Sequence, residues 1–101
     1  MTNREFSARV KETARRIPPG YVLSYGRLAA LAGFPSRARG AGFVMRSCQD
    51  ASVPCHRVVF ADGKLTEEGI FPEPGQRALL EAEGVLFLPD GRVDMPRCLW
   101  L

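Results

Sequence analysis

Two short helix-forming segments separated by a four-residue turn constrain the fold of this chain more than any other feature. Ser24 can accept a hydrogen bond at the start of a helix over residues 25–32, and Gly33 suits the position just after its end. The turn closes with Ser36, which can cap a second helix over residues 37–47. Two helices joined by a tight turn of this kind form a helix-turn-helix, whose second helix commonly contacts DNA.

The rest of the chain predicts one more helix and a few short strands. Thr2 and Glu5 match a capping box, and the apolar stripe that follows them reaches Ile17, just before two prolines and a glycine. Further along we expect a brief strand or connector at 21–23, a strand at 58–60, a return strand at 64–65, a helix at 76–83 and a terminal hairpin over 85–95. The predicted fold class is mainly α with a small β component: a winged helix-turn-helix-like, three-helix DNA-binding domain. Its 101 residues leave room for a single domain over 1–101.

Positive charge is concentrated in the first half of the chain. The net charge is +3, but residues 1–47 carry +7 and residues 48–101 carry −4. Eight of the nine cations in the first half are arginine, whose planar guanidinium can bind phosphate through two hydrogen bonds. This pattern is typical of a nucleic-acid-binding surface, and a basic face that only meets solvent is the alternative.

Cys55 and His56 are the strongest candidates for chemistry. His56 is the only histidine of the chain, and an imidazole beside a thiol can take its proton and generate the nucleophilic thiolate. Pro54 stiffens the approach to the cysteine, and two valines shortly after it predict a buried strand. The alternative is a buried structural cysteine beside a surface histidine.

Cysteine spacing and hydropathy limit the classes of protein to consider. The three cysteines cannot all pair, and with one histidine they match no zinc-binding pattern. No apolar run approaches the roughly 20 residues of a membrane span, and the polar N-terminus is unlike a secretory signal. We therefore expect free thiols, a cytoplasmic location, no membrane contact, and neither a metal ion nor an organic cofactor.

Four short motifs occur in an order that resembles a known DNA-repair family. They run from Ser24 to Gly33, from Ala38 to Gly42, from Pro54 to Val59 and from Leu80 to Gly84. Together they resemble the DNA-binding domain of the O6-alkylguanine-DNA alkyltransferases over nearly the whole chain. The resemblance implies a protein that binds double-stranded DNA in the minor groove and flips out O6-alkylguanine, because the O6 substituent cannot be reached inside a duplex.

The resemblance assigns DNA contacts to the helix-turn-helix. Arg39 matches an arginine finger that fills the space left by the flipped base, and Tyr25 matches a tyrosine that presses on the phosphate backbone. Small residues after the finger would let the second helix lie deep in the groove. Tyr25 can also be an ordinary helix-start aromatic, Arg39 a surface phosphate contact, and the small residues a close helix–helix contact. The DNA-binding set implied is Ser24, Tyr25, Arg39, Gly40, Ala41 and Gly42.

The resemblance also assigns a reaction to Cys55, His56 and Glu83. His56 would take the thiol proton through a water molecule, and Glu83 would hold the imidazole in the right tautomer. The thiolate would then displace guanine from the alkyl carbon, and the stable thioether would end the activity of that protein molecule. Arg57, like Pro54, would support the active loop rather than react. For Glu83, a plain exposed position in the last helical turn is the alternative.

Several positions depart from the transferase pattern. A tyrosine–serine pair that usually lines the alkyl pocket corresponds to Glu68 and Gly69, and an asparagine that closes the second helix corresponds to Cys48. Phe43 is bulkier than the residues usual on that helix, and we expect no counterpart of the domain that precedes this one in many transferases. The acidic side chain of Glu68 would remove apolar pocket wall and place a negative charge near the thiolate.

The short length and the tail over residues 92–100 are instead similar to the alkyltransferase-like proteins. Those proteins bind O6-alkylguanine and hand it to nucleotide excision repair, and they usually carry tryptophan at the position of Cys55 and an arginine near Ile70. The sequence thus supports a monomer with one of two functions: transfer of the alkyl group to Cys55 in a single turnover, or lesion binding that recruits nucleotide excision repair proteins. A cysteine–histidine hydrolase unrelated to DNA is a third, remoter alternative.

Overall fold

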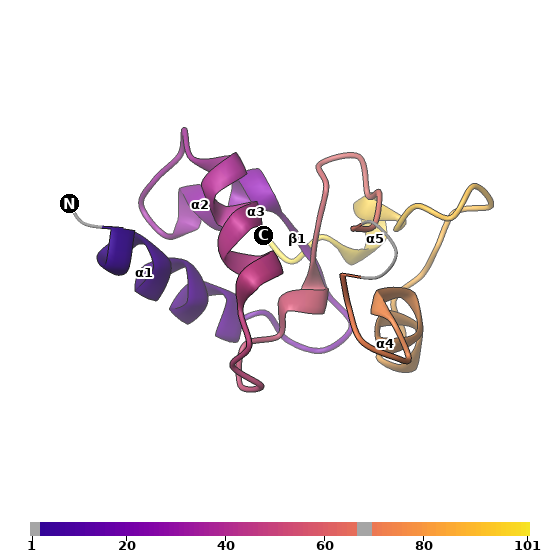
Figure 1. The fold of residues 1–101 in the computed structure, drawn as a ribbon. Coiled ribbons are helices and arrows are strands. Elements are labelled where there is room, and N and C mark those ends of the chain that lie inside the picture. Colours follow the sequence, from indigo (N-terminus) through magenta and orange to yellow (C-terminus); the bar gives the residue numbers. More distant parts are fainter. Residues whose placement is uncertain (1–2, 67–69) are drawn as a thin grey trace.

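The computed structural model describes residues 3–66 and 70–101 as a set of helices around one short parallel sheet (Figure 1). This architecture confirms the predicted class, mainly α with a small β component. Thr2, the expected first residue of the capping box, lies outside the described residues. In chain order the elements are α1 (Asn3–Arg15), β1 (Leu23–Ser24), α2 (Tyr25–Leu31), α3 (Ala38–Ser47), the 3-10 helix η1 (Cys55–Arg57), β2 (Val58–Val59), α4 (Gln76–Ala82) and α5 (Met95–Cys98).

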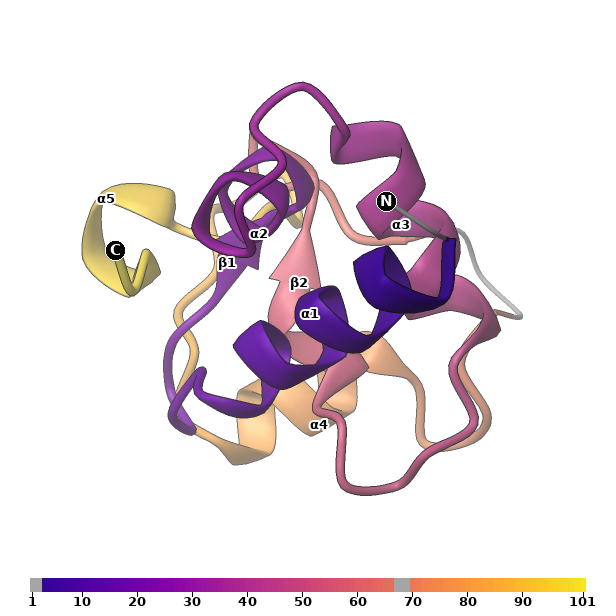
Figure 2. The same ribbon diagram turned by 90° about the vertical axis from the view of Figure 1, so that its left-hand side faces the viewer.

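Helix α1 packs through one apolar face onto the elements that carry the site. Phe6, Val10 and Ala14 recur at helical spacing, and all three are buried. Ile17 continues this face just beyond the helix end and is 1% exposed. Figure 2 shows α1 lying in front of β2, with α2 and α3 beside it. The N-terminal half therefore forms one core of three helices, as predicted.

Helices α2 and α3 form the predicted helix-turn-helix. Ser24 caps α2 as expected, because its side-chain oxygen accepts a hydrogen bond from the backbone N–H of Arg27 at 3.1 Å. The prediction that Ser36 caps α3 is wrong: Arg37 occupies that position and makes no capping hydrogen bond through its side chain. The guanidinium of Arg37 instead stacks over the Phe6 ring, 4.0 Å from its centroid. Packing onto α1 thus anchors the start of α3 in place of a side-chain cap.

The two strands pair in parallel and join the two halves of the protein. Leu23 of β1 lies opposite Val58 of β2, and Ser24 lies opposite Val59. The prediction of a return strand at 64–65 is wrong, since only one backbone hydrogen bond, from Phe60 N–H to the Lys64 carbonyl at 3.0 Å, links that segment to the chain after β2. Because η1 runs directly into β2, this pairing fixes the segment that carries the candidate nucleophile against the N-terminal core.

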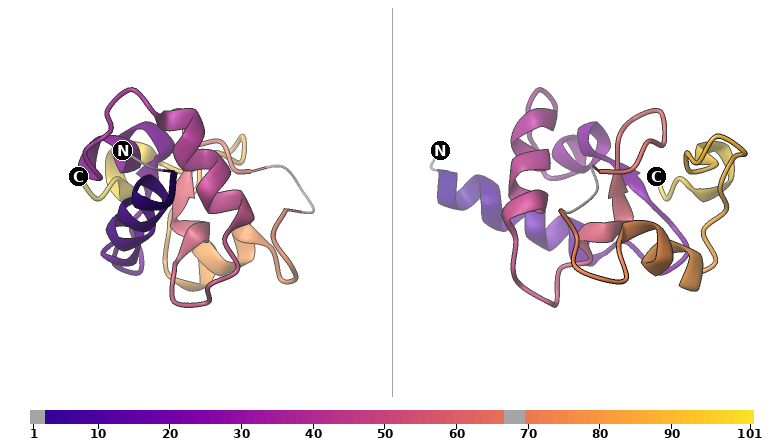
Figure 3. Two further views of the ribbon diagram at one scale, coloured as in Figure 1. Left: turned by 60° about the vertical axis from the view of Figure 1, so that its left-hand side comes forward. Right: turned by 45° about the vertical axis from the view of Figure 1, so that its right-hand side comes forward.

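The C-terminal half packs around a second, smaller apolar cluster on the far side of the sheet from α1 (Figure 3). The terminal hairpin forms between Phe87 and Val93, and the predicted second strand ends there because α5 begins at Met95. The backbone of Val22 then accepts a hydrogen bond from Trp100 and donates one to Cys98. The buried members of this cluster are Val22, Val59, Leu80, Val85, Val93 and Cys98.

Two features are missing from residues 3–66 and 70–101. No helix there has both the length and the apolar character needed to cross a bilayer. No group of three or more His, Cys, Asp or Glu side chains there is arranged to hold a metal ion.

Candidate active site and DNA-facing surface

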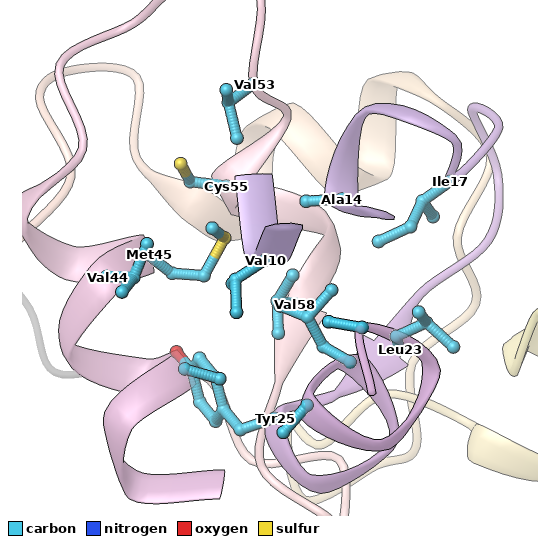
Figure 4. Packing of buried hydrophobic residues seen from close by; sticks show 14 of the residues in the cluster. Val10, Ala14, Ile17, Leu23, Tyr25, Val44, Met45, Val53, Cys55 and Val58 are labelled. Atoms are coloured by element: carbon cyan, nitrogen blue, oxygen red, sulfur yellow. The ribbon is translucent and has the colours of Figure 1, made fainter. Parts of the chain in front are cut away.

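Cys55 is the first residue of η1 and lies at the edge of the N-terminal core. Its backbone N–H donates to the carbonyl of Val53 at 2.8 Å, and Arg57 N–H donates to the carbonyl of Pro54 at 3.0 Å, which closes the turn around the cysteine. Figure 4 shows the Cys55 side chain beside Val53 and near the sulfur of Met45. The thiol is therefore largely surrounded by apolar groups, with 9% of the residue exposed.

His56, Arg57 and Glu83 meet although Glu83 is 26 residues beyond Arg57. The Nε2 atom of His56 lies 3.0 Å from Oε2 of Glu83. Arg57 donates from Nε to Oε1 at 2.9 Å and from Nη2 to Oε2 at 2.6 Å, so it grips the same carboxylate with two nitrogens. A carboxylate can only accept, so His56 Nε2 carries a hydrogen, and in the neutral tautomer that this bond selects Nδ1 is the proton acceptor.

The ionised form of Glu83 is favoured in this arrangement. Burial alone would raise the pKa of Glu83, but hydrogen bonds from Arg57 and His56 outweigh it and hold the pKa below the usual value. Arg57 also donates from Nη1 to the backbone carbonyl of Ile17 at 2.8 Å. The ion pair therefore ties η1 to the end of α4 and to the segment after α1, and the predicted supporting role of Arg57 matches these contacts.

The thiol of Cys55 is held in its protonated form. Burial, followed by the interaction with the neighbouring Cys48 thiol, raises the pKa of Cys55 from 9.0 to about 12. Among the described residues, no direct hydrogen bond joins the Cys55 thiol to His56, so a proton transfer between them needs a bridging water. Any attack by this sulfur therefore depends on removal of its proton.

The thiol of Cys48 contributes to the raised pKa of Cys55, and mutation can remove this contribution. We expect Cys48→Ala to lower the pKa of Cys55, because it removes a neighbouring group that disfavours the thiolate. The rate of Cys55 alkylation by iodoacetamide, mapped by peptide mass spectrometry as a function of pH, should then rise at every pH below the new pKa. Cys98→Ala, in the second apolar cluster, is the matched control and should leave this profile unchanged. An identical profile in Cys48→Ala and the native protein would contradict the assignment.

Gln76 links η1 and β2 to Thr66 through its side-chain amide. It was not among the predicted site residues. Its Nε2 donates to the carbonyls of His56 and Val58 at 3.1 Å each, and its Oε1 accepts from the N–H of Thr66 at 2.9 Å. The residue is only 5% exposed, so these bonds satisfy a buried amide. Gln76 therefore fixes η1 against Thr66. A single glutamine at a helix start carries no local signal of such long-range contacts.

Ser24 and Tyr25 lie inside the protein rather than on its surface. The oxygen of Ser24 is used by the cap of α2, and the residue is 7% exposed. Tyr25 is 6% exposed; its hydroxyl lies 2.7 Å from Oγ1 of Thr66, and its ring meets Phe60 edge-on with centroids 5.2 Å apart. In this structure both side chains support the site from within, and their contact with DNA stays a prediction.

The small residues of α3 serve packing as well as the predicted groove contact. A Cβ on Gly40 would come within 3.1 Å of the Phe6 ring, so close contact with α1 already requires glycine there. Ala41 is fully buried, and Gly42 is buried beside Tyr25, where it also lines a surface hollow. Arg39 alone of the predicted α3 contacts has an exposed side chain. Close helix packing, the alternative interpretation, therefore explains the small side chain at Ala41 and is one reason for glycine at position 40.

Two hollows lie beside α3, and Phe60 lines both of them. One, of about 250 Å³, is lined by Arg39, Arg46 and Tyr25 among others, and Phe60 closes it. The second, of about 340 Å³, shares Arg46 and Phe60 and adds Thr66 and Ile70. Glu68 and Gly69, expected at the pocket wall, lie outside the described residues. The walls of both hollows combine apolar and cationic side chains.

Comparison with known proteins agrees with this geometry. The family model described as 6-O-methylguanine DNA methyltransferase, DNA binding domain, matches residues 5–85. The chain is 40% identical over 96 residues to a DNA base-flipping protein of Escherichia coli, covering 94% of this chain and 74% of that one.

Two solved structures share the fold. Atl1 of S. pombe, in complex with damaged DNA containing O6-carboxymethylguanine, superposes with a TM-score of 0.85 at 33% identity, over 100% of this chain and 99% of that one. Mycobacterium tuberculosis OGT in complex with DNA gives a TM-score of 0.69 at 41% identity, over 78% of this chain but only 48% of that one. The chain thus spans about half the length of that second protein. It belongs to the family of 6-O-methylguanine DNA methyltransferase DNA-binding domains.

Proposed function

We propose that this protein binds duplex DNA in the minor groove through α3, flips out O6-alkylguanine and transfers the alkyl group to Cys55 in a single turnover. The observation that carries the proposal is the fixed His56–Glu83 pair, 3.0 Å apart, directly beside the cysteine in the chain. A base held in one tautomer by a carboxylate is the arrangement that activates a weak nucleophile. A purely structural cysteine would need none of it.

The atoms and protons of the proposed transfer balance without a cofactor. The thiol proton passes through a water to Nδ1 of His56 as the sulfur of Cys55 attacks the alkyl carbon. A sulfur–carbon bond forms, the bond from that carbon to O6 breaks with its electron pair moving to the guanine, and the guanine finally takes up one proton. Glu83 stabilises the imidazolium that forms in between. The products are unmodified guanine and a thioether on Cys55.

The relatives support the DNA part of the proposal. Base flipping is in the name of the Escherichia coli relative, and the Atl1 complex holds an O6-alkylated guanine. Lesions of this kind lie in chromosomal DNA, so we propose a cytoplasmic location, at the nucleoid if the host cell is prokaryotic.

A lesion sensor without transfer is the second candidate function. The raised pKa of Cys55, about 12, leaves very little thiolate at neutral pH, and Atl1 matches this chain over its full length whereas OGT does not. In this case Cys55 fills the pocket, and bound lesions would be passed to nucleotide excision repair proteins. The two candidates differ in one observable: only the transferase leaves a covalent product.

Arg39 provides the test of lesion recognition. We expect Arg39→Ala to weaken binding to a duplex with one O6-methylguanine by roughly tenfold or more, because an extruded base leaves a gap that costs a few kcal/mol to leave unfilled. Fluorescence anisotropy at one fixed salt concentration measures this against the unmodified duplex. Arg97→Ala is the control, since Arg97 is exposed on α5 at the opposite end of the chain. Equal affinity of the native protein for both duplexes would refute lesion recognition.

A further inference from the structure

An exposed ridge along α3 is not explained by the packing of the protein. Arg39, Phe43 and Arg46 follow one another at intervals of four and three residues, so their side chains share one face of the helix. All three are exposed, whereas Val44 and Met45 on the other face are buried in the core. Both views in Figure 3 show α3 at the outside of the molecule. The ridge is therefore available to a partner along most of the helix.

Phe43 is the unusual member of this ridge. It is 68% exposed, more than any other large apolar side chain among the described residues. Isolated apolar residues are common on protein surfaces, but this one stands between two arginines. Neither Arg39 nor Arg46 makes an ion pair within residues 3–66 and 70–101, and α3 contains no acidic residue. An apolar ring framed by positive charge is suited to a polyanion with an apolar interior.

Hollows flank the ridge on both sides. On the side of α1, a hollow of about 290 Å³ is lined by Phe43, Lys11 and Arg37, together with the apolar Phe6 and Val44 and several small or polar residues. On the other side lies the hollow of about 250 Å³ that includes Arg39 and Arg46. Cations thus border the ridge on each side. Two phosphate backbones with a groove between them would place negative charge at both positions.

The dimensions of DNA explain why a bulky ring would be useful there. The minor groove of ordinary duplex DNA is about 6 Å wide, which is narrower than a helix with its side chains. Proteins that enter this groove often insert an apolar side chain between two base pairs, which bends the duplex toward the major groove. We propose that Phe43 is such a wedge, inserted into the minor groove beside Arg39 and bending the duplex as α3 enters. This inference rests on the proposed minor-groove binding and adds a residue that deforms the DNA.

The test compares Phe43→Ala with Phe43→Leu, using plain and O6-methylguanine duplexes. We expect Phe43→Ala to weaken binding to both duplexes about tenfold, since stacking of a base on an aromatic ring is lost. Because phenylalanine is neutral, the dependence of affinity on salt concentration should not change, whereas Arg46→Ala should reduce that dependence by about one phosphate contact. Energy transfer between dyes on the duplex ends should report a smaller bend with Phe43→Ala and a largely retained bend with Phe43→Leu. Tyr21→Ala, which removes another exposed aromatic ring away from α3, is the control and should bind as the native protein does.

Each outcome separates this inference from the proposed function. If the native protein binds duplex DNA while Phe43→Ala keeps its affinity and bend, the wedge is refuted and minor-groove binding stands; the ring would then be free for a protein partner. If Phe43→Ala loses affinity only through a changed salt dependence, the effect is electrostatic and the wedge is refuted as well. If the native protein binds neither duplex, the proposed function fails together with this inference. Far-UV circular dichroism of each variant verifies that the exposed substitution leaves the fold intact.

Discussion

Cys55→Ala is expected to abolish removal of the methyl group from O6-methylguanine in duplex DNA while leaving lesion binding within a few-fold of the native protein. The side chain supplies the only atom that forms the new bond, so no residual transfer can pass through His56 or Glu83. Its small volume and position at the edge of the core make its replacement by alanine a modest packing change. Nuclease digestion of the DNA and quantification of the remaining O6-methylguanine measure the effect.

Cys48→Ala is the matched control for this variant. It removes a thiol from the same neighbourhood but not the acceptor, so methyl removal should persist and be faster than in the native protein, in line with the lowered pKa expected for Cys55. Continued methyl removal by Cys55→Ala would exclude Cys55 as the acceptor. Loss of lesion binding in the same variant would instead show that the thiol is needed for recognition.

Arg57→Met is expected to reduce the free energy of unfolding by about 1–3 kcal/mol, because it removes the guanidinium hydrogen bonds from the partly buried carboxylate of Glu83. Arg57 and Glu83 side chains are 15% and 17% exposed, and the variant also leaves the Ile17 carbonyl without its donor. Small domains have only about 5–15 kcal/mol of stability in total, so the variant should unfold at a much lower urea concentration. Arg15→Met, which breaks ion pairs at the surface, is the control and should shift the urea midpoint little.

The Arg57–Glu83 ion pair also predicts how the difference in free energy of unfolding between the native protein and Arg57→Met depends on pH. The folded state holds the pKa of Glu83 below its unfolded value, so it binds fewer protons and the stabilisation is present above the unfolded pKa, near 4.5. As the pH falls through the folded pKa, this stabilisation is lost in the native protein. In Arg57→Met most of it is already absent, so the two unfolding curves should converge in acid. A difference that stayed constant at low pH would contradict the role given to this ion pair.

Local sequence signals sufficed for the elements that depend on neighbouring residues. Ser24 followed by a helix-forming run predicted its cap, and the spacing of Phe6, Val10 and Ala14 predicted the buried face of α1. The cap at Ser36 was wrong because the contact of Arg37 with Phe6, a residue on another helix, decides where α3 begins. Tertiary packing there overrides a local preference.

Local sequence patterns could not predict the contacts between residues that are far apart in the chain. The parallel pair of β1 and β2 joins residues far apart in the chain, and each strand has only two residues to carry a periodicity. Gln76 reaches His56, Val58 and Thr66 through one amide, which no spacing rule reveals. The small residues of α3 were ambiguous for a related reason, because glycine permits close approach to a helix as well as to DNA, and contact with Phe6 was found at Gly40.

The most direct test of alkyl transfer is intact-protein mass spectrometry after incubation with duplex DNA that contains O6-methylguanine. We expect a stoichiometric gain of one methyl group in place of a hydrogen, mapped by peptide analysis to Cys55. An unchanged mass, in a sample where anisotropy shows the lesion duplex to be bound, would contradict the transfer and leave a sensor with an unused thiol.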